Sequence, residues 1–141
     1  MKLLVDSFIN PEIKDYLLSQ KGINDVNIKE VGINIEIEIE YDDISPIVIM
    51  KHIDLYCDNK LPVLLKFDKC LKGEKKKINY NVNDMCCDQC YRSLVMELFE
   101  NKFINSVRSN FDYMLAVLNT DFEIEYINCD EEEIIKIFNK Y

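Results

Sequence analysis

Two stretches in the first half of the chain are repeated, in the same order, in the second half. The segment Ile23-Asn24-Asp25-Val26 reappears 81 positions later as Ile104-Asn105-Ser106-Val107, and Ile37-Glu38-Ile39-Glu40-Tyr41 reappears 85 positions later as Phe122-Glu123-Ile124-Glu125-Tyr126. Repetition at a nearly constant offset is typical of a duplicated structural unit. We therefore expect two similar units, the second with about four extra residues between its middle strands.

The first copy has the pattern of a βαββαβ unit. Residues 33–41 alternate apolar and polar side chains, which predicts a strand with one buried face. Asn10-Pro11 and Ser45-Pro46 are typical helix starts, and Gly22 is a typical helix end. This is the ferredoxin-like arrangement, an α+β fold. The predicted elements are strands at 2–8, from Val26, at 33–41 and at 61–67, and helices at 10–22 and from Ser45 to about Asn59.

The second copy repeats this order from residue 75. The segment 112–121 either lengthens the middle hairpin or forms a strand of its own. Asp130 is expected to cap the last helix, with Glu133 completing a capping box. The last strand of the fold is missing, because Tyr141 aligns with Tyr56 at the end of the second helix. The predicted elements are a strand at 77–83, a helix at 88–101 with Leu94, Val95, Leu98 and Phe99 on one side, and strands near Val107 and at 122–127.

These patterns divide the chain into a domain at 1–70 and a domain at 75–141. Without a last strand, the second domain would leave its first strand with a bare edge, which proteins normally avoid. We expect the strands at 61–68 and 77–83 to pair as a hairpin. One strand would then serve both domains in a continuous, antiparallel or mixed sheet of about seven strands. A homodimer that pairs two bare edges is the alternative.

Composition narrows the class of protein. A net charge of −9 argues against a general nucleic-acid binder and against docking on anionic lipid. No apolar run reaches the roughly 18 residues that span a membrane, and Asp6 and Asn10 interrupt the apolar start too early for a signal peptide. We therefore expect a cytoplasmic protein whose six cysteines are reduced thiols.

Half of the cysteines are concentrated in one segment, Met85-Cys86-Cys87-Asp88-Gln89-Cys90, between a predicted strand and a predicted helix. Cys87 and Cys90 can converge on one point if Cys90 lies in the first helical turn. The N–H groups at a helix start favour thiolate over thiol, and two thiolates on an exposed loop suit a soft ion such as Cu(I). Zn(II) is the second choice even with Cys86 as a third ligand, because it normally takes four ligands and the single histidine, His52, lies in the other copy.

The second copy resembles the heavy-metal-associated domain family, which includes copper chaperones and the N-terminal domains of copper-transporting ATPases. The similar features are the Met-x-Cys-x-x-Cys loop, the helix with Leu94 and Leu98, the strand at 122–126 and the C-terminal helix ending at Tyr141. Asp84 and Lys140 stand where the family has glycines. The resemblance implies that Cys87 and Cys90 bind metal, that Met85 packs beneath the loop, and that Tyr141 lies near it.

The predicted function is the binding and delivery of a soft metal, not enzymatic catalysis. The expected partner is a metal-transporting ATPase or another acceptor with its own cysteines. At the offset of 81, Asp6 and Ile9 stand opposite Cys87 and Cys90, so the first copy is read as a degenerate partner without metal ligands. Two alternatives stay open: a protein-interaction or regulatory module that has lost metal transport, and a thiol oxidoreductase.

Overall fold

The computed structural model describes residues 1–5, 9–57, 64–83, 85, 88–111 and 119–141. The chain divides into two compact units, Met1–Leu64 (unit 1) and Leu65–Tyr141 (unit 2). The described residues form seven strands and four helices, and the paired strands within each unit are antiparallel. The predicted α+β class is therefore confirmed, and the arrangement is compatible with ferredoxin-like units.

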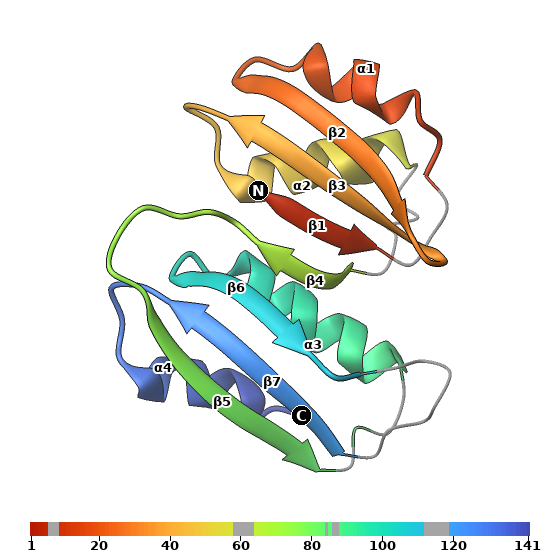
Figure 1. Cartoon of the computed structure of the whole chain (residues 1–141). Helices are drawn as coiled ribbons and strands as arrows, with labels where there is room; N and C mark the ends of the chain where they lie inside the picture. The colour runs from red at the N-terminus through yellow and green to blue at the C-terminus, as the bar shows by residue number, and fades with distance from the viewer. Residues whose placement is uncertain (6–8, 58–63, 84, 86–87, 112–118) are drawn as a thin grey trace. The chain divides into compact units, whose positions relative to one another are not determined.

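Unit 1 has a three-stranded sheet in the order β2-β3-β1 (Figure 1). Its sequence pattern explains the core, because alternate residues of β3 face opposite sides of the sheet. Ile37 and Ile39 are fully buried, as are Ile13 and Leu17 from the first helix, so the helical apolar stripe packs on the apolar face of the sheet. The elements are β1 (Lys2–Val5), α1 (Ile13–Leu18), β2 (Ile23–Val31), β3 (Asn34–Tyr41) and α2 (Pro46–Tyr56).

The helix signals of unit 1 agree with the prediction at Ser45. α1 is shorter than the predicted 10–22, because Glu12 is its N-cap and Ser19 its C-cap, so Asn10 and Gly22 lie outside it. The Ser45 hydroxyl accepts a hydrogen bond from the Val48 amide at 3.2 Å and caps α2. The Asn10 carboxamide accepts one from the Glu12 amide at 3.0 Å, one turn before α1. Gly22 follows α1 with φ +95°, and a Cβ there would lie 2.7 Å from the Asp42 carbonyl oxygen, so only glycine fits this connection.

Unit 2 has a four-stranded sheet in the order β4-β6-β7-β5, with α3 and α4 on one face (Figure 1). The predicted apolar side of α3 is confirmed, because Leu94, Val95, Leu98 and Phe99 are all fully buried. The elements are β4 (Leu64–Asp68), β5 (Lys76–Asn83), α3 (Asp88–Glu100), β6 (Ile104–Ser109), β7 (Asn119–Tyr126) and α4 (Glu131–Phe138). Most of the ambiguous segment, 112–118, lies outside the described residues.

The predicted hairpin between the strands at 61–68 and 77–83 is wrong. β4 pairs with β6, where Phe67 faces Val107, whereas β5 pairs with β7 over its whole length, so the two strands lie at opposite edges of the unit 2 sheet. The connection between them is fastened to β6 instead of forming a tight turn. The Lys69 amide donates to the Asn105 carbonyl at 2.8 Å, and the Leu71 amide donates to the Asn105 side chain at 2.7 Å.

The middle hairpins of the two units share one geometry. Ile23 pairs with Tyr41 in unit 1, Ile104 pairs with Tyr126 in unit 2, and each hairpin has a register shift immediately after that pair. These pairs reproduce the offsets of 81 and 85 between the matching sequences. The stretch from Ile104 to Tyr126 is therefore four residues longer than the stretch from Ile23 to Tyr41, as predicted.

The capping box predicted for α4 is wrong. Asp130 occupies the N-cap position, but its side chain makes no capping hydrogen bond. The Glu133 amide donates to the Asp130 backbone carbonyl at 3.0 Å, and the Glu133 carboxylate accepts from Lys136 at 3.0 Å. In a capping box, the Glu133 carboxylate would accept a hydrogen bond from the Asp130 amide. Here the carboxylate pairs with Lys136 instead.

Lys69 is a buried cation with its side chain at the end of α3. Only 2% of its surface is exposed, and its ammonium donates to the Phe99 carbonyl at 2.9 Å and to the Asn101 carbonyl at 2.7 Å. Burial lowers the pKa of Lys69 to about 8. The last carbonyls of a helix lack partners within the helix, so Lys69 supplies donors to the carbonyls at the end of α3.

Among the described residues, no helix combines the length and apolar character that spanning a bilayer requires.

Candidate metal centre

Of the cysteine segment, Met85 lies between β5 and α3, and Cys90 lies in the first turn of α3, as predicted. Met85 is 5% exposed and belongs to the core, in agreement with a methionine that packs beneath the loop. Cys90 is the third residue of α3 and is half-buried. Cys86 and Cys87 lie outside the described residues, so Cys90 is the thiol of the motif whose position is described. The structure therefore fixes a core anchor at one end of the motif and one thiol at the other.

The position of Cys90 has a chemical consequence. The first four N–H groups of an α-helix have no carbonyl partner within the helix, and the helix carries a partial positive charge at that end. α3 is long, Asp88–Glu100, and Cys90 lies in its first turn. Helix N-termini in general favour thiolates, and the thiolate is the form that binds metal.

A carboxylate on α3 holds the C-terminal residues of the chain. Glu97 accepts a hydrogen bond from the Tyr141 hydroxyl at 2.9 Å and a second one from the Lys140 ammonium. The hydrogen bond from Lys140 lowers the pKa of Glu97, burial opposes this, and the hydrogen bond from Tyr141 adds to the lowering. Glu97 therefore stays ionised and fixes Tyr141 beside α3.

Tyr141 has a raised pKa. Burial, the hydrogen bond and charge of Glu97, and the charge of Cys90 together raise the pKa of Tyr141 to about 12. Residues 86 and 87 of the loop lie outside the described residues, so the implied position of Tyr141 near the metal loop stays a prediction.

Glu97 was missed by the sequence analysis. Its only signal is its spacing, because Cys90 and Glu97 lie seven positions apart on α3 and so share one face of the helix. At the aligned positions of unit 1, Tyr16 and Tyr56 are ring neighbours with centroids 5.2 Å apart. Both units therefore join their two helices at this point, but only unit 2 does so through a carboxylate.

The strand register corrects the alignment of Asp6 with Cys87. Val5 pairs with Ile35 and Val82 pairs with Thr120, so the first strands of the two units correspond at an offset of 77. The helices and second strands correspond at 81, as the pair Ile23 and Ile104 shows. The stretch from Val82 to Ile104 in unit 2 is therefore four residues longer than the stretch from Val5 to Ile23 in unit 1, and the cysteine motif lies in this longer stretch.

The other three cysteines and the histidine were not among the predicted ligands. Cys57 and Cys129 are half-buried, and Cys70 is exposed. His52 lies on α2 of unit 1, where its ring contacts Tyr16 with centroids 6.4 Å apart. Within the part of the chain that the structure describes, which leaves out Cys86 and Cys87, no group of three or more histidine, cysteine or acidic side chains can hold a metal ion.

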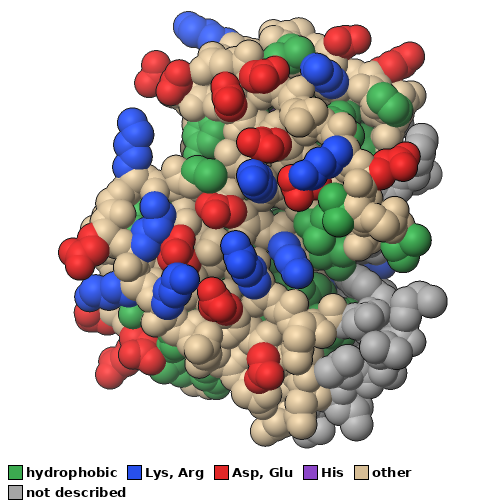
Figure 2. All heavy atoms as spheres, viewed as in Figure 1, with side chains coloured by type: hydrophobic (Ala, Val, Ile, Leu, Met, Phe, Trp, Pro, Cys, Tyr) green, Lys and Arg blue, Asp and Glu red, His purple; other side chains and the backbone are tan. Residues whose placement is uncertain are grey.

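A shallow hollow lies elsewhere in unit 2, on the face of the sheet opposite α3 and α4. Its volume is about 550 Å³, and its lining includes Asn79, Asn81, Arg108, Asp121 and Glu123. Figure 2 shows cationic and acidic side chains intermixed on the viewed face. Carboxylate, amide and guanidinium groups are poor ligands for a soft ion, so this hollow is separate from the candidate metal centre.

Comparison with known proteins gives one structural similarity. No protein-family model matches the chain, and no curated protein matches it. The chain is similar to a solution structure of the N-terminal soluble domains of Bacillus subtilis CopA, with a TM-score of 0.36 and 13% identity over 99% of this chain and 88% of that chain. At this TM-score the similarity does not establish a shared fold. The proposals below are therefore based on the residues of this chain.

Proposed function

We propose that this chain binds Cu(I) through the thiolates of Cys87 and Cys90 and passes the ion to an acceptor protein that has its own pair of cysteines. The observation that carries the proposal is the position of Cys90, half-buried in the first turn of α3 and five residues after the buried Met85. The sequence Met85-Cys86-Cys87-Asp88-Gln89-Cys90 places Cys87 one residue before this helix. Cys86 is adjacent and can supply a third thiolate.

The chemistry of the donors favours a soft ion with few ligands. Thiolates select Cu(I), zinc and iron–sulfur clusters over hard cations. Structural zinc normally takes four protein ligands, whereas Met85-Cys86-Cys87-Asp88-Gln89-Cys90 offers three sulfur atoms from cysteine at most. Zn(II) is therefore the second choice, and a monomer would need an additional ligand to hold it.

Delivery by this chain would be an exchange of thiolates. A thiolate of the acceptor forms a bond to Cu(I) while the bond to Cys87 or Cys90 breaks, and a second exchange completes the transfer. Each step forms one metal–sulfur bond and breaks one, and the ion keeps its oxidation state. The hydrogen bond from Tyr141 to Glu97 ties the C-terminal residue to α3, the helix that carries Cys90.

A competition titration tests the proposal. Reduced protein is titrated with Cu(I), and separately with Zn(II), against a chelator of known affinity. We expect one Cu(I) per chain, and a loss of affinity of roughly 100-fold or more in Cys87→Ser or Cys90→Ser, which exceeds the effect typical of losing an outer-shell contact. Cys70→Ser removes an exposed thiol outside the motif. It is the matched control and should leave binding unchanged.

The variant Cys86→Ser decides whether a third thiolate takes part. We expect it to keep one-to-one Cu(I) binding, since two thiolates satisfy this ion. Weak binding that is the same in all four cysteine variants would contradict the proposal.

The burial of Ile9 supports a different function for unit 1. Ile9, at the position that the offset of 81 aligns with Cys90, is 4% exposed and contributes to the core. A buried isoleucine cannot ligate a metal, so we propose that unit 1 serves in protein interaction or regulation. A Cu(I) stoichiometry of two per chain would contradict this assignment.

A further inference from the structure

β5 is an outer strand of the unit 2 sheet. It pairs with β7 over all of Lys76–Asn83, and among the described residues of this unit no strand lies on its other side (Figure 1). In an antiparallel pair, every second residue turns its N–H and C=O groups away from the neighbouring strand. β5 therefore directs a row of backbone groups outward, where another strand can pair with them.

The centre of β5 reads almost the same in both directions. In Ile78-Asn79-Tyr80-Asn81-Val82, the residues on either side of Tyr80 are both asparagine, and the next ones out are both branched aliphatic residues. Ile78 and Val82 are buried on the helix-covered face of the sheet, whereas the two asparagines are exposed on the other face. A strand of this kind is chemically complementary to a second copy of itself that runs in the opposite direction.

We propose that β5 pairs with β5 of a second copy of this chain, antiparallel and with the two-fold axis at Tyr80. In this register Ile78 lies opposite Val82 of the second copy, and Asn79 lies opposite Asn81. The pairing keeps every buried side chain on the buried face of both sheets, since a shift by one residue would turn it to the other face. The interface is isologous, as closed two-fold dimers require.

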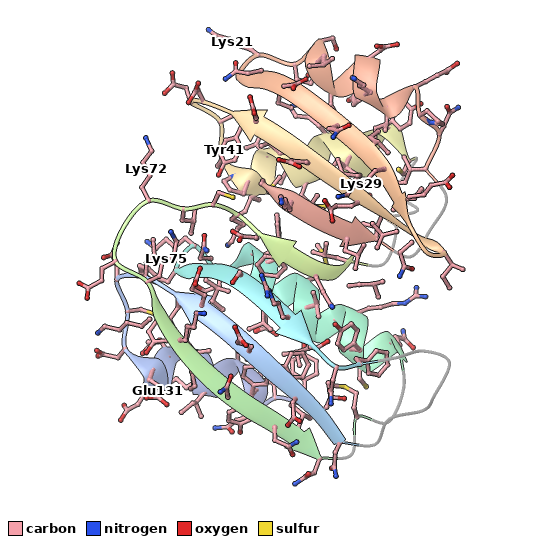
Figure 3. The ribbon with its side chains drawn as sticks, viewed as in Figure 1. Lys21, Lys29, Tyr41, Lys72, Lys75 and Glu131 are labelled. Atoms are coloured by element: carbon pink, nitrogen blue, oxygen red, sulfur yellow. The ribbon has the colours of Figure 1, made fainter. Side chains whose placement is uncertain are left out.

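The charges of the strand favour the same arrangement. Lys75, Lys76 and Lys77 are exposed at the beginning of β5 (Figure 3 labels Lys75), and Lys77 contacts Glu123 at 3.7 Å. Antiparallel pairing about Tyr80 places the lysines of the two copies at opposite ends of the junction, with Lys77 opposite Asn83. A parallel pairing would put the lysine clusters side by side, and like charges that face each other across two strands are destabilising.

The size of the junction sets the strength of the dimer. One pair of eight-residue strands buries less than the roughly 1,200 Å² that begins the range of stable interfaces, so the dimer should be weak and should form reversibly. The proposal does not depend on metal binding. Its tests are therefore made with reductant and chelator present, which exclude disulfide-linked and metal-bridged dimers.

Sedimentation velocity over a range from micromolar to millimolar protein tests the association. We expect the mass to rise from 16.7 kDa toward twice that value as the concentration increases. Hydrogen exchange measured over the same range should show increasing protection of alternate amides in β5 and unchanged protection in β6. A chain that stays monomeric at millimolar concentration would overturn the proposal, as would a dimer whose β5 amides exchange at the monomer rate.

A double variant, Asn79→Lys with Asn81→Lys, tests the register. In the monomer these positions face Glu123 and Asp121 on β7, so the new lysines have carboxylates opposite them and the fold should be kept. In the dimer each new lysine faces a new lysine of the other copy. We expect the dissociation constant to rise roughly tenfold or more, and each single variant to have a smaller effect, because it places a lysine opposite an asparagine.

The matched control adds charge to the same sheet away from the edge. Ser106→Lys places a lysine on β6 opposite Glu125, and it should leave the dissociation constant unchanged. A thermal unfolding transition in the double variant verifies that it is folded. Unaltered dimerisation of the folded double variant would overturn the register, and a stoichiometric complex of a monomeric chain with an acidic extended peptide would assign the edge to a different partner.

Discussion

Lys69 and Glu97 are charged side chains whose roles depend on contacts with distant parts of the chain. Lys69 follows β4 and donates to carbonyls at the end of α3, thirty or more positions away in sequence. Glu97 on α3 accepts from Lys140 and Tyr141 beyond α4. In both cases the charged group has hydrogen-bond partners at a helix end or just after a second helix. These partners permit the charge to be partly or completely buried.

Replacement of Lys69 tests the lowered pKa. The folded-state pKa of about 8 lies below the unfolded value, so the unfolded chain binds more protons between these values and stability rises with pH across that window. From about pH 7.5 to about pH 9.5 this rise should be on the order of 2 kcal/mol, and it should be absent in Lys69→Met. The measurement is the free energy of unfolding in urea at both pH values.

The control for this prediction is Lys66→Met, which removes an exposed lysine from β4, the strand just before Lys69, and should keep the full rise. Thiols and tyrosines titrate in the same range in all three proteins, so only the difference between variants is interpreted. Equal pH dependence in Lys69→Met and the unaltered chain would contradict the assigned burial.

Sequence reasoning located Met85 and Cys90 but missed residues whose role depends on tertiary contacts. A short motif is enough to place Met85 in the core and Cys90 in the first turn of α3, whereas the metal site of Cys87 and Cys90 stays a prediction. Lys69 follows a strand and precedes a polar turn, where a lysine is normally solvated. Its burial depends on where α3 ends, and no local pattern records that.

At the scale of elements, Gly22 marked a required turn but not the end of a helix. α1 ends at Leu18, and Gly22 directly precedes β2 with φ +95°. The Gly22 carbonyl accepts the Asp42 amide at 2.8 Å, which joins the start of β2 to the end of β3. The strand at 33–41 was predicted from alternation alone, and Asn34–Tyr41 forms β3. The capping box at Asp130 failed because its carboxylate partner has a nearer cation in Lys136.

Gly22→Ala tests this connection against a matched glycine. We expect Gly22→Ala to lower the free energy of unfolding by roughly 2 kcal/mol or more, because a left-handed residue with a Cβ is strained and this Cβ would also clash with the Asp42 carbonyl. Gly32→Ala should cost about 1 kcal/mol, since Gly32 has φ +63° with open space around it. Equal losses in denaturant unfolding would show that the clash contributes nothing.

Strand order was the element-level property that the sequence could not supply. Both β4 and β5 were located from their apolar patterns, but pairing them as neighbours was wrong. Adjacency along the chain is a reasonable guide, because sequential strands are neighbours about two-thirds of the time. β6 can pair with a strand on each of its two sides. Here β7 pairs with one side to form the middle hairpin, and β4 pairs with the other side.

At the scale of the whole molecule, two units of similar design differ in the length of two stretches. Their middle hairpins share the register shift after Ile23 and after Ile104, and their helices meet at aligned positions. In unit 2 the middle hairpin is longer, and so is the stretch from Val82 to Ile104, where the cysteines of the motif lie. This division accounts for a chain with two scaffolds and one proposed metal site.

X-ray absorption spectroscopy of the reduced chain loaded with one equivalent of Cu(I) examines that site directly, because it identifies the atoms bound to the metal. The account predicts two sulfur ligands, both retained in Cys70→Ser, with one of them lost in Cys90→Ser. Nitrogen or oxygen ligands in the unaltered chain, or a spectrum that Cys90→Ser leaves unchanged, would contradict it.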